Sequence, residues 1–191
     1  MKNYYTKMKL PEPLVPALQA LSLLKGQTAL VTGANSGIGR AIAVSLGRAG
    51  ANVVVNYVVK PEEAEAVVGE IQGGGGHATA IRADVGDEAQ VVAMFAEAVK
   101  AFGTVDILVS NAGMERNAPF HEVTTAQWDA VMNVNLRGAF LCAREAVREF
   151  LRAGRIDEAT AQLDRLAGAA REVLTEVREG ILALRAAGRT D

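Results

Sequence analysis

A glycine-rich segment near the start of the chain has the residue types and spacing to bind a phosphate group. Its sequence is Thr-Gly-Ala-Asn-Ser-Gly-Ile-Gly from Thr32 to Gly39, and it lies between a short apolar run, which predicts a strand, and a helical pattern. Glycine lets the chain turn tightly and lets a ligand approach the backbone. The free amides and the dipole at a helix N-terminus favour negative charge. The segment predicts a phosphate-binding loop, with an ordinary strand-to-helix turn as the alternative.

Polar residues of interest follow two later apolar runs and lie on one predicted helix. Asp84 ends the third apolar run, and Asn111 ends the fourth. Each could bind a ligand or simply form a turn, which both residue types favour. Asn135 shares a predicted helix face with Val131 and Ala139. If it is buried, its amide needs hydrogen-bond partners, so it is either a satisfied core amide or a chemically active group.

The elements that must position these residues alternate along the middle of the chain. Short apolar runs bounded by glycine or polar residues predict buried strands at 29–32, 52–56, 78–83 and 105–110. Helical patterns lie between them. Pro61 fits a first helical position, and Asp87 with Gln90 and Thr124 with Gln127 form capping pairs. Alternating strands and helices predict an α/β fold with a parallel sheet and right-handed crossovers.

Three zones divide the chain: an N-terminal arm at 1–25, an α/β domain at 26–152 and an amphipathic helical segment at 153–191. The arm holds three of the five prolines. A sheet that stops after four strands leaves an exposed edge, which invites aggregation unless something covers it. We expect the C-terminal segment to cover that edge, either directly or by pairing with a second copy. The residues expected to be buried are Leu163, Leu166, Val173, Val177 and Ile181.

Composition excludes several classes of protein. The 191 residues are 50% apolar and 22% charged, which predicts one soluble globular domain rather than a disordered chain. The net charge of -2 offers no basic surplus for nucleic acid or anionic membranes. The single Cys142 excludes an internal disulfide and a cysteine-based zinc site, so no metal is expected and a reducing cytoplasm is predicted. No apolar stretch is long enough to span a bilayer.

The spacing Thr-Gly-x-x-x-Gly-Ile-Gly resembles that of the short-chain dehydrogenases/reductases. Three further segments resemble family motifs in the same order: Asp84-Val85, Asn111-Ala112-Gly113 and Asn133-Val134-Asn135-Leu136. The resemblance covers about residues 26–152, and its stretch from Asn111 to Ala146 looks closest to bacterial glucose 1-dehydrogenases. It implies a truncated, Rossmann-like doubly wound parallel sheet of about four strands, followed by a C-terminal helical segment.

The same resemblance implies a site for NAD or NADP. The glycine-rich loop would hold the phosphates, Asp84 would accept from the adenine amine, and Asn135 would act only as a relay through water. The residues implied to contact the cofactor are Thr32, Gly33, Ser36, Gly37, Ile38, Gly39, Asp84, Val85, Asn111, Ala112 and Gly113. An acidic residue at the end of the second strand would select NAD, and an arginine would accept the extra phosphate of NADP. The segment 56–60, Asn-Tyr-Val-Val-Lys, has neither, so the choice stays open.

The family's hydride transfer implies a Tyr-x-x-x-Lys pair and a serine downstream of Asn135. The chain's only tyrosines are Tyr4, Tyr5 and Tyr57, its last lysine is Lys100, and only threonines supply hydroxyls after Asn135. The segment from Tyr5 to Lys9 has the spacing but is followed by prolines. We therefore expect dinucleotide binding with little or no hydride transfer. The alternative is an engineered or recombined interaction module that self-associates through its C-terminal helices.

Overall fold

A four-stranded parallel sheet forms the centre of the molecule. The structure is a computed structural model that describes residues 22–157, 160–161, 163–165 and 167–168. The strands are β1 (Thr28–Val31), β2 (Asn52–Tyr57), β3 (His77–Arg82) and β4 (Ile107–Val109), and their order across the sheet is β3-β2-β1-β4. Strand β1 pairs in parallel with β2, with Leu30 opposite Val54, and with β4, with Leu30 opposite Leu108. The predicted Rossmann-like α/β fold and its four strands are confirmed.

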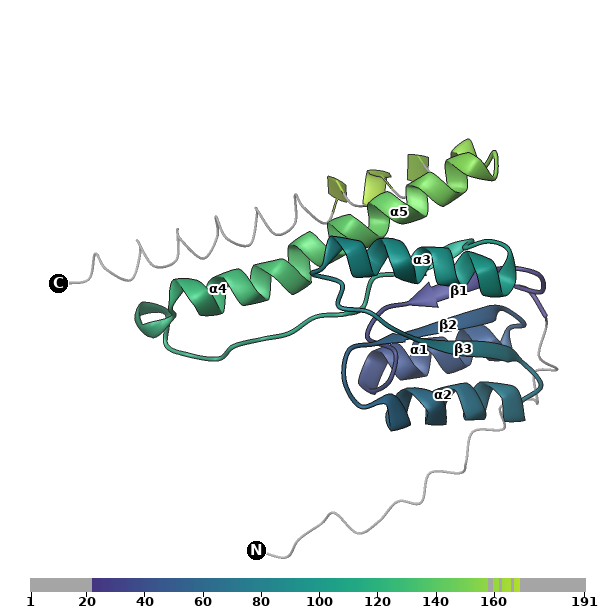
Figure 1. Ribbon diagram of the computed structural model, residues 1–191, viewed down its shortest axis with the longest axis horizontal. Coiled ribbons are helices and arrows are strands. Elements are labelled where there is room, and N and C mark those ends of the chain that lie inside the picture. Colours follow the sequence, from purple (N-terminus) through teal and green to yellow (C-terminus); the bar gives the residue numbers. More distant parts are fainter. Residues whose placement is uncertain (1–21, 158–159, 162, 166, 169–191) are drawn as a thin grey trace, which may run out of the picture.

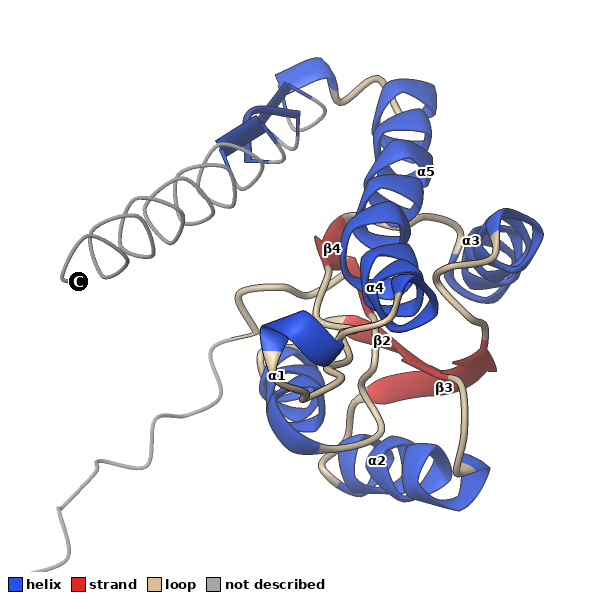
Figure 2. Cartoon of the chain, turned by 90° about the vertical axis from the view of Figure 1, so that its left-hand side faces the viewer, coloured by secondary structure: helices blue, strands red, loops and turns tan. Residues whose placement is uncertain are grey.

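Helices cover both faces of the sheet (Figure 1). Helices α1 (Gly37–Arg48) and α2 (Pro61–Gly73) lie on one side, and α3 (Glu88–Phe102) and α5 (Ala139–Arg152) lie on the other, as Figure 2 also shows. Successive residues of β1 alternate between two cores. Leu30 belongs to the α3 and α5 side, and Ala29 and Val31 belong to the α1 and α2 side. A strand buried on both faces explains why its sequence is continuously apolar.

The predicted helix caps are present. The Asp87 side chain accepts from the backbone amides of Ala89 and Gln90, at 2.9 and 3.1 Å, at the start of α3. Thr124 and Gln127 form a reciprocal capping box at the start of α4 (Thr125–Met132). The sequence therefore located both helix starts correctly, because each cap depends only on neighbours within one turn.

Helix α4 continues into a segment that the sequence did not predict. Residues Asn133–Gly138 form a π-helical turn, η2, between α4 and α5. A loop with one short 3-10 turn, η1 (Phe120–Glu122), leads from β4 to α4, and this loop and α4 extend away from the sheet (Figure 1). π-helical turns are rare and are frequent at functional sites.

Burial differs from the sequence expectation at two places. Leu163 is 53% exposed within a single chain. Its expected burial against the sheet is therefore not seen, and the alternative, burial against a second copy, stays a prediction. Asn135 is also exposed rather than buried. Residues 1–21 of the arm expected at 1–25, and the positions Leu166, Val173, Val177 and Ile181, lie outside the described residues. Among the residues that the structure describes, no helix is long and apolar enough to cross a membrane.

Candidate functional site

The glycine-rich loop has a backbone that only glycine fits well. Gly33 and Gly37 have φ angles of +60° and +54°, in the left-handed region that other residues rarely adopt. A Cβ atom added at Gly39 would lie 2.3 Å from the Gly33 carbonyl oxygen and 2.5 Å from Nδ2 of Asn111. The loop therefore folds back closely over the first turn of α1 and leaves its backbone accessible to a ligand.

The N-terminus of α1 has no side chain that satisfies its amides. Ser36 occupies the N-cap position with an extended backbone, but its side chain makes no capping hydrogen bond, and the first turn contains no acidic residue. Helices α3 and α4 differ, because the side chains of Asp87 and Thr124 cap them. A helix start with free amides and no carboxylate attracts an anion through its hydrogen-bond donors and its dipole.

Thr32 and Asn111 tie the end of β1 to the end of β4. The Thr32 hydroxyl accepts from the backbone amides of Asn111 and Ala112, both at 2.9 Å, and donates to the Val109 carbonyl at 3.3 Å. In return, Nδ2 of Asn111 donates to the carbonyls of Thr32 and Gly33 at 2.9 and 3.1 Å. Thr32 is 1% exposed. These two side chains therefore fix the loop in place, and the Thr32 hydroxyl faces the protein.

Asn56 of β2 holds the glycine loop through a hydrogen bond to Gly33. It was not identified as a site residue from the sequence. It is 1% exposed, and its side-chain oxygen accepts from the Gly33 amide at 3.2 Å. Its amide group donates to the carbonyls of Ile81 and Ala83 at 3.3 and 3.0 Å. The available signal was a polar residue inside an otherwise apolar buried strand, since such a group must find partners.

The loop, the start of α1 and the turn after β4 line a cavity of about 330 Å³ that is open to solvent. Seven of the predicted contact residues line it together with Asn35: Gly33, Ser36, Ile38, Gly39, Asn111, Ala112 and Gly113. Thr32 lies beneath the loop, and a Cβ at Gly37 would meet open space. This cavity lies where the strand order reverses between β1 and β4, which is the position at which α/β sheets bind ligands.

Asp84 and Val85 lie outside this cavity. Asp84 lines a separate hollow of about 520 Å³, and its Oδ1 accepts from the Gly86 amide at 2.8 Å. Val85 is buried, in contact range of Gly138 of η2. The predicted adenine contact of Asp84 therefore stays a prediction, because one of its carboxylate oxygens already bonds the turn after β3.

Asn135 holds the chain that follows β4. Its Oδ1 accepts from the Met114 amide at 2.8 Å, and its Nδ2 donates to the Met114 carbonyl at 3.0 Å. Met114 directly follows Gly113, which lines the cavity. Of the two alternatives drawn from the sequence, the contacts favour a satisfied amide, although an exposed one. Its proposed relay role stays a prediction.

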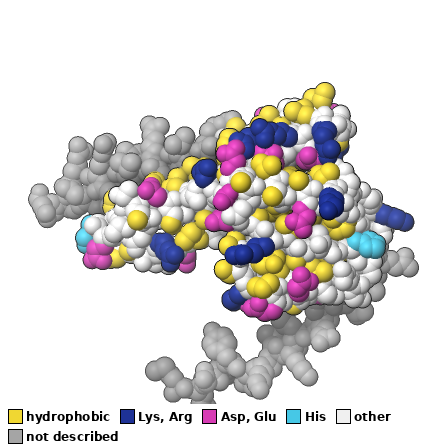
Figure 3. Space-filling model, in the orientation of Figure 1, with side chains coloured by type: hydrophobic (Ala, Val, Ile, Leu, Met, Phe, Trp, Pro, Cys, Tyr) yellow, Lys and Arg dark blue, Asp and Glu magenta, His cyan; other side chains and the backbone are white. Residues whose placement is uncertain are grey.

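A cysteine thiol or a cluster of metal ligands could also supply chemistry away from the cavity. Burial, with the nearby Glu145 carboxylate, raises the pKa of the Cys142 thiol to about 12, so this thiol is not a nucleophile near neutral pH. No cluster of three potential metal ligands occurs within the described ranges. On the face seen in Figure 3, basic and acidic side chains are interspersed, with no field of one sign. The predicted absence of a nucleic-acid partner fits that face but is not tested by it.

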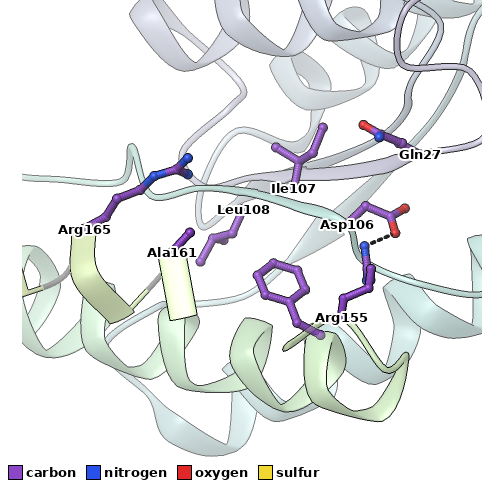
Figure 4. Close-up of a pocket in the computed structure, with 8 residues that line it drawn as sticks. Gln27, Asp106, Ile107, Leu108, Arg155, Ala161 and Arg165 are labelled. Carbon is purple, nitrogen blue, oxygen red and sulfur yellow. Dashed lines mark hydrogen bonds and ion pairs between the residues drawn. The ribbon is translucent and has the colours of Figure 1, made fainter. Parts of the chain in front are cut away.

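A third cavity, of about 340 Å³, opens beside β4 at Asp106, before the strand begins (Figure 4). Arg155 pairs there with Asp106 and also donates to the Val105 carbonyl at 2.9 Å. The glycine loop contacts the other end of β4, after Val109. This cavity therefore lies away from the proposed phosphate site and adjoins the structural attachment of Arg155.

The strand order, the glycine loop and the open start of α1 together define a Rossmann-like dinucleotide-binding domain. Its family follows from sequence comparison. The family model described as short chain dehydrogenase matches residues 27–160, and the chain belongs to this family.

Individual relatives support the same assignment. The chain is 50% identical over 133 residues to versicolorin reductase of Emericella nidulans, covering 70% of this chain and 50% of that protein. It is 45% identical over 147 residues to tetrahydroxynaphthalene reductase of Pyricularia oryzae, covering 77% and 51%. A short chain dehydrogenase structure from Burkholderia cenocepacia in complex with NADP matches at 41% identity and a TM-score of 0.65, covering 66% and 52%. The chain thus spans about half the length of the relatives that it matches.

Proposed function

We propose that this chain binds NAD or NADP, with the cofactor's pyrophosphate at the N-terminus of α1. The observation that carries the proposal is the uncapped, acid-free start of α1 facing the cavity formed by Gly33, Ser36, Gly39 and Asn111. The residues fit such a group, because a Cβ at Gly37 would extend into open space where a phosphate must approach. The complex of the Burkholderia relative with NADP supports the choice of ligand.

The chain's own residues would bind and orient the cofactor. Asn56, Thr32 and Asn111 hold the loop, and the amides of the first turn of α1 would donate to the phosphates. The bound nicotinamide would supply hydride donor or acceptor chemistry. Asn135 keeps Met114 and the preceding turn in position beside the cavity.

We further propose that this chain by itself transfers hydride poorly or not at all. The supporting observation is that its sequence has no serine and no Tyr-x-x-x-Lys after Asn135, where the family resemblance places them. A missing general acid or base typically costs about 10²- to 10⁴-fold in rate. The relatives named as reductases are about twice as long as the segment that matches this chain. Reductase activity is therefore an expectation for the family and not an expectation for this chain alone.

The substrate proposal stays at the level of the family. The stretch from Asn111 to Ala146 resembles glucose 1-dehydrogenases, whereas relatives at 45–50% identity are named reductases of versicolorin and tetrahydroxynaphthalene. A substrate panel tests both possibilities. Glucose and simple alcohols are assayed for oxidation with NAD or NADP, and an aromatic ketone is assayed for reduction with NADH or NADPH. We expect no turnover above that of a loop variant. Robust turnover that is lost in Tyr5→Phe would instead support an active site built around Tyr5 and Lys9.

Self-association is a second candidate function. Leu151, Ile156 and Leu163 are 54%, 65% and 53% exposed, which places apolar side chains on the surface at and after the end of α5. A second copy of the chain could cover them. Light scattering after size separation, with and without cofactor, tests this: a concentration-independent monomer would exclude it.

Binding is tested by the melting temperature in millimolar NAD or NADP, because a ligand that binds only the folded state raises it. The matched variants are Gly37→Val in the loop and Gly103→Val at the end of α3, since both glycines have positive φ and open space around the missing Cβ. Both variants should melt earlier than the parent. Only Gly37→Val should lose the cofactor-induced rise. A folded parent whose melting temperature responds to neither cofactor would contradict the proposal.

A further inference from the structure

The π-helical turn η2 contacts two turns that follow strands of the sheet. Asn135 bonds the backbone of Met114, in the turn after β4, with its side-chain oxygen at 2.8 Å and its side-chain nitrogen at 3.0 Å. The Arg137 guanidinium donates to the Gly86 carbonyl, in the turn after β3, at 2.5 Å. Because β3 and β4 belong to one parallel sheet, the turns after them lie at the same edge of it. One turn of helix thus links the two turns.

Asn133 makes the contact between η2 and Gly86 closer. Its Oδ1 accepts from the Arg137 guanidinium at 3.1 Å, which orients that side chain. A Cβ atom added at Gly86 would lie 2.2 Å from Nδ2 of Asn133 and 3.3 Å from Oδ1 of Asp84. The Gly86 amide also donates to this Asp84 oxygen at 2.8 Å. Gly86 is therefore held between η2 and the Asp84 carboxylate.

The two turns adjoin two separate spaces. Gly113, which precedes Met114, lines the glycine-loop cavity of about 330 Å³. Asp84, Gly86 and Arg137 line the hollow of about 520 Å³. A single ligand that occupied both spaces would bind best where their separation is already fixed, because ordering the site on binding costs affinity. Through Asn135 and Arg137, η2 contacts the walls of both spaces.

Arg137 lies at the surface, since the residue is exposed. A hydrogen bond in contact with solvent adds little to the stability of a fold, because water competes for both partners. The bond from Arg137 to the Gly86 carbonyl therefore acts on local geometry: it fixes the turn after β3 relative to η2. Loss of this bond should loosen that turn without unfolding the protein.

From these contacts we propose that Arg137 is a positioning residue for the adenosine half of a bound dinucleotide and acts through the turn after β3. By holding the Gly86 carbonyl, it keeps the Asp84 carboxylate, the expected acceptor from the adenine amine, at a fixed place relative to the glycine loop. This inference rests on the proposed function, because it takes the pyrophosphate to lie at the start of α1.

The experiment compares ligands with and without adenosine. Titration calorimetry of the full chain gives dissociation constants for NAD or NADP, whichever binds more tightly, and for ADP, with inorganic pyrophosphate measured by competition. Arg137→Met keeps a long side chain but removes its donors. We expect the dinucleotide and ADP to bind about fivefold more weakly, the loss typical of one exposed hydrogen bond from a charged donor. Pyrophosphate should change by less than about twofold.

Three further variants separate positioning from a general loss of structure. Arg137→Lys keeps a charged donor and should bring dinucleotide binding back to within about twofold of the parent. Asn135→Ala lies on the same turn, but Met114 adjoins the glycine-loop cavity, so all three ligands should weaken by a similar factor. Arg152→Met, at the end of α5, removes an exposed pair with Glu149 and should change none of the constants.

The failures of the two proposals are distinguishable. A folded parent that binds no dinucleotide contradicts the proposed function, and this inference fails with it. If the parent binds a dinucleotide but Arg137→Met leaves its affinity unchanged, or weakens pyrophosphate as much as ADP, dinucleotide binding stands and the positioning role of Arg137 is overturned. The same holds if Arg137→Lys binds as weakly as Arg137→Met.

Discussion

Thr32 and Asn111 make their contacts with each other's backbone rather than with the cavity. The hydroxyl of Thr32 accepts from the Asn111 and Ala112 amides, and the side chain of Asn111 donates to the Thr32 and Gly33 carbonyls. A site of this kind depends on a rigid backbone, because its donors to phosphate are amides of the main chain. These polar side chains therefore act by holding the loop, and substituting either one would displace the amides.

Gly39→Ala should damage the loop although it adds a single methyl group. The new Cβ would lie 2.3 Å from the Gly33 carbonyl oxygen and 2.5 Å from Nδ2 of Asn111, so backbone and side chain must both move. We expect a loss of about 1–3 kcal/mol in the free energy of unfolding, as for other overpacked sites, together with loss of cofactor binding. Urea denaturation and cofactor titration measure the two effects.

Gly69→Ala is the matched control for that substitution. Gly69 lies within α2 with open space around the missing Cβ, so alanine should stabilise the helix by up to about 1 kcal/mol and leave cofactor binding unchanged. A Gly39→Ala protein as stable as the parent, with intact binding, would mean that the loop can open where the structure has it closed.

At the scale of single residues, the sequence predicted which glycines and amides meet at the site but not the role of each. Seven of the predicted contact residues line one cavity. Thr32 was expected to face the phosphates, whereas its hydroxyl faces the backbone of the turn after β4, 77 or more positions away in sequence. Asn56 was missed for the same reason, since its partners come from the loop and from the end of β3. Contacts across strands depend on the register of the sheet, which no local pattern specifies.

Among helices α1 to α4, the start of α1 differs from the others in having neither a side-chain cap nor an acidic residue in its first turn, where the proposed ligand would bind. Helix α3 begins at Asp87 and α4 begins at Thr124, and each residue caps its helix through its own side chain. Helix α1 begins at Ser36 without such a bond. Helix α2 also lacks a side-chain cap, but its first turn contains Glu62 and Glu63. Because α1 has neither a cap nor a carboxylate in its first turn, α1 is the helix start that an anion should stabilise.

The cap at Asp87 should make the stability of α3 depend on pH. Hydrogen bonds from Gln90, first from its backbone and then from its side chain, hold the pKa of Asp87 below its ordinary value of 3.8. A lowered folded pKa means that the carboxylate stabilises the protein above about pH 4 and that this stabilisation is lost as the pH falls through the folded value. Asp87→Asn cannot titrate. We therefore expect it to melt below the parent at pH 7, with the difference narrowing as the pH falls below 3.8 toward the lowered folded pKa.

Gln90→Leu provides the control for that comparison, because it removes the side-chain donor to Asp87 at 3.0 Å and keeps the backbone donor. In this background the effect of Asp87→Asn should be smaller at pH 7. Thermal unfolding followed by circular dichroism at several pH values measures all four proteins. A difference between parent and Asp87→Asn that stays constant from pH 7 down to the lowest pH at which both proteins are folded would contradict the linkage.

The π-helical turn η2 is an element that the sequence did not predict. Strands and helix starts were predicted to within one or two residues because they follow local periodicity and capping, although β4 is shorter than the run at 105–110. The turn at η2 instead depends on distant contacts. Asn135 bonds Met114, and Gly138 lies so close to Val85 that a Cβ would be 2.7 Å from it. Such packing overrides the regular helix that the sequence pattern predicts.

At the scale of the whole molecule, Arg155 joins the segment after α5 to the edge of the sheet at β4. Within the described residues β4 pairs on one side only, with β1. Beyond α5, the chain turns at Gly154 and pairs Arg155 with Asp106 (Figure 4). Arg155 also donates to the Thr104 hydroxyl and to the Val105 carbonyl. Asp106 also accepts from the Thr28 amide at 2.6 Å. The segment after α5 thus contacts the starts of β1 and β4 through Asp106. In the described residues, this contact beside the edge strand is an ion pair and not the leucine packing that the sequence led us to expect.

This ion pair should couple α5 to the sheet strongly. The side chains of Arg155 and Asp106 are 22% and 13% exposed, and breaking a largely buried pair leaves one charge without its partner, which typically costs about 3 kcal/mol. We expect Arg155→Met and Asp106→Asn each to lower the free energy of unfolding by about 2–3 kcal/mol, and the double variant to lose less than the sum. The exposed pair of Arg152 with Glu149, one turn earlier, is the matched control, and its cycle should give about 0.5 kcal/mol or less. Urea denaturation of the seven proteins, the parent being common to both cycles, yields both coupling energies. Equal coupling in the two cycles would mean that Arg155 is no more than a surface contact and that α5 is held to the sheet by its apolar face alone.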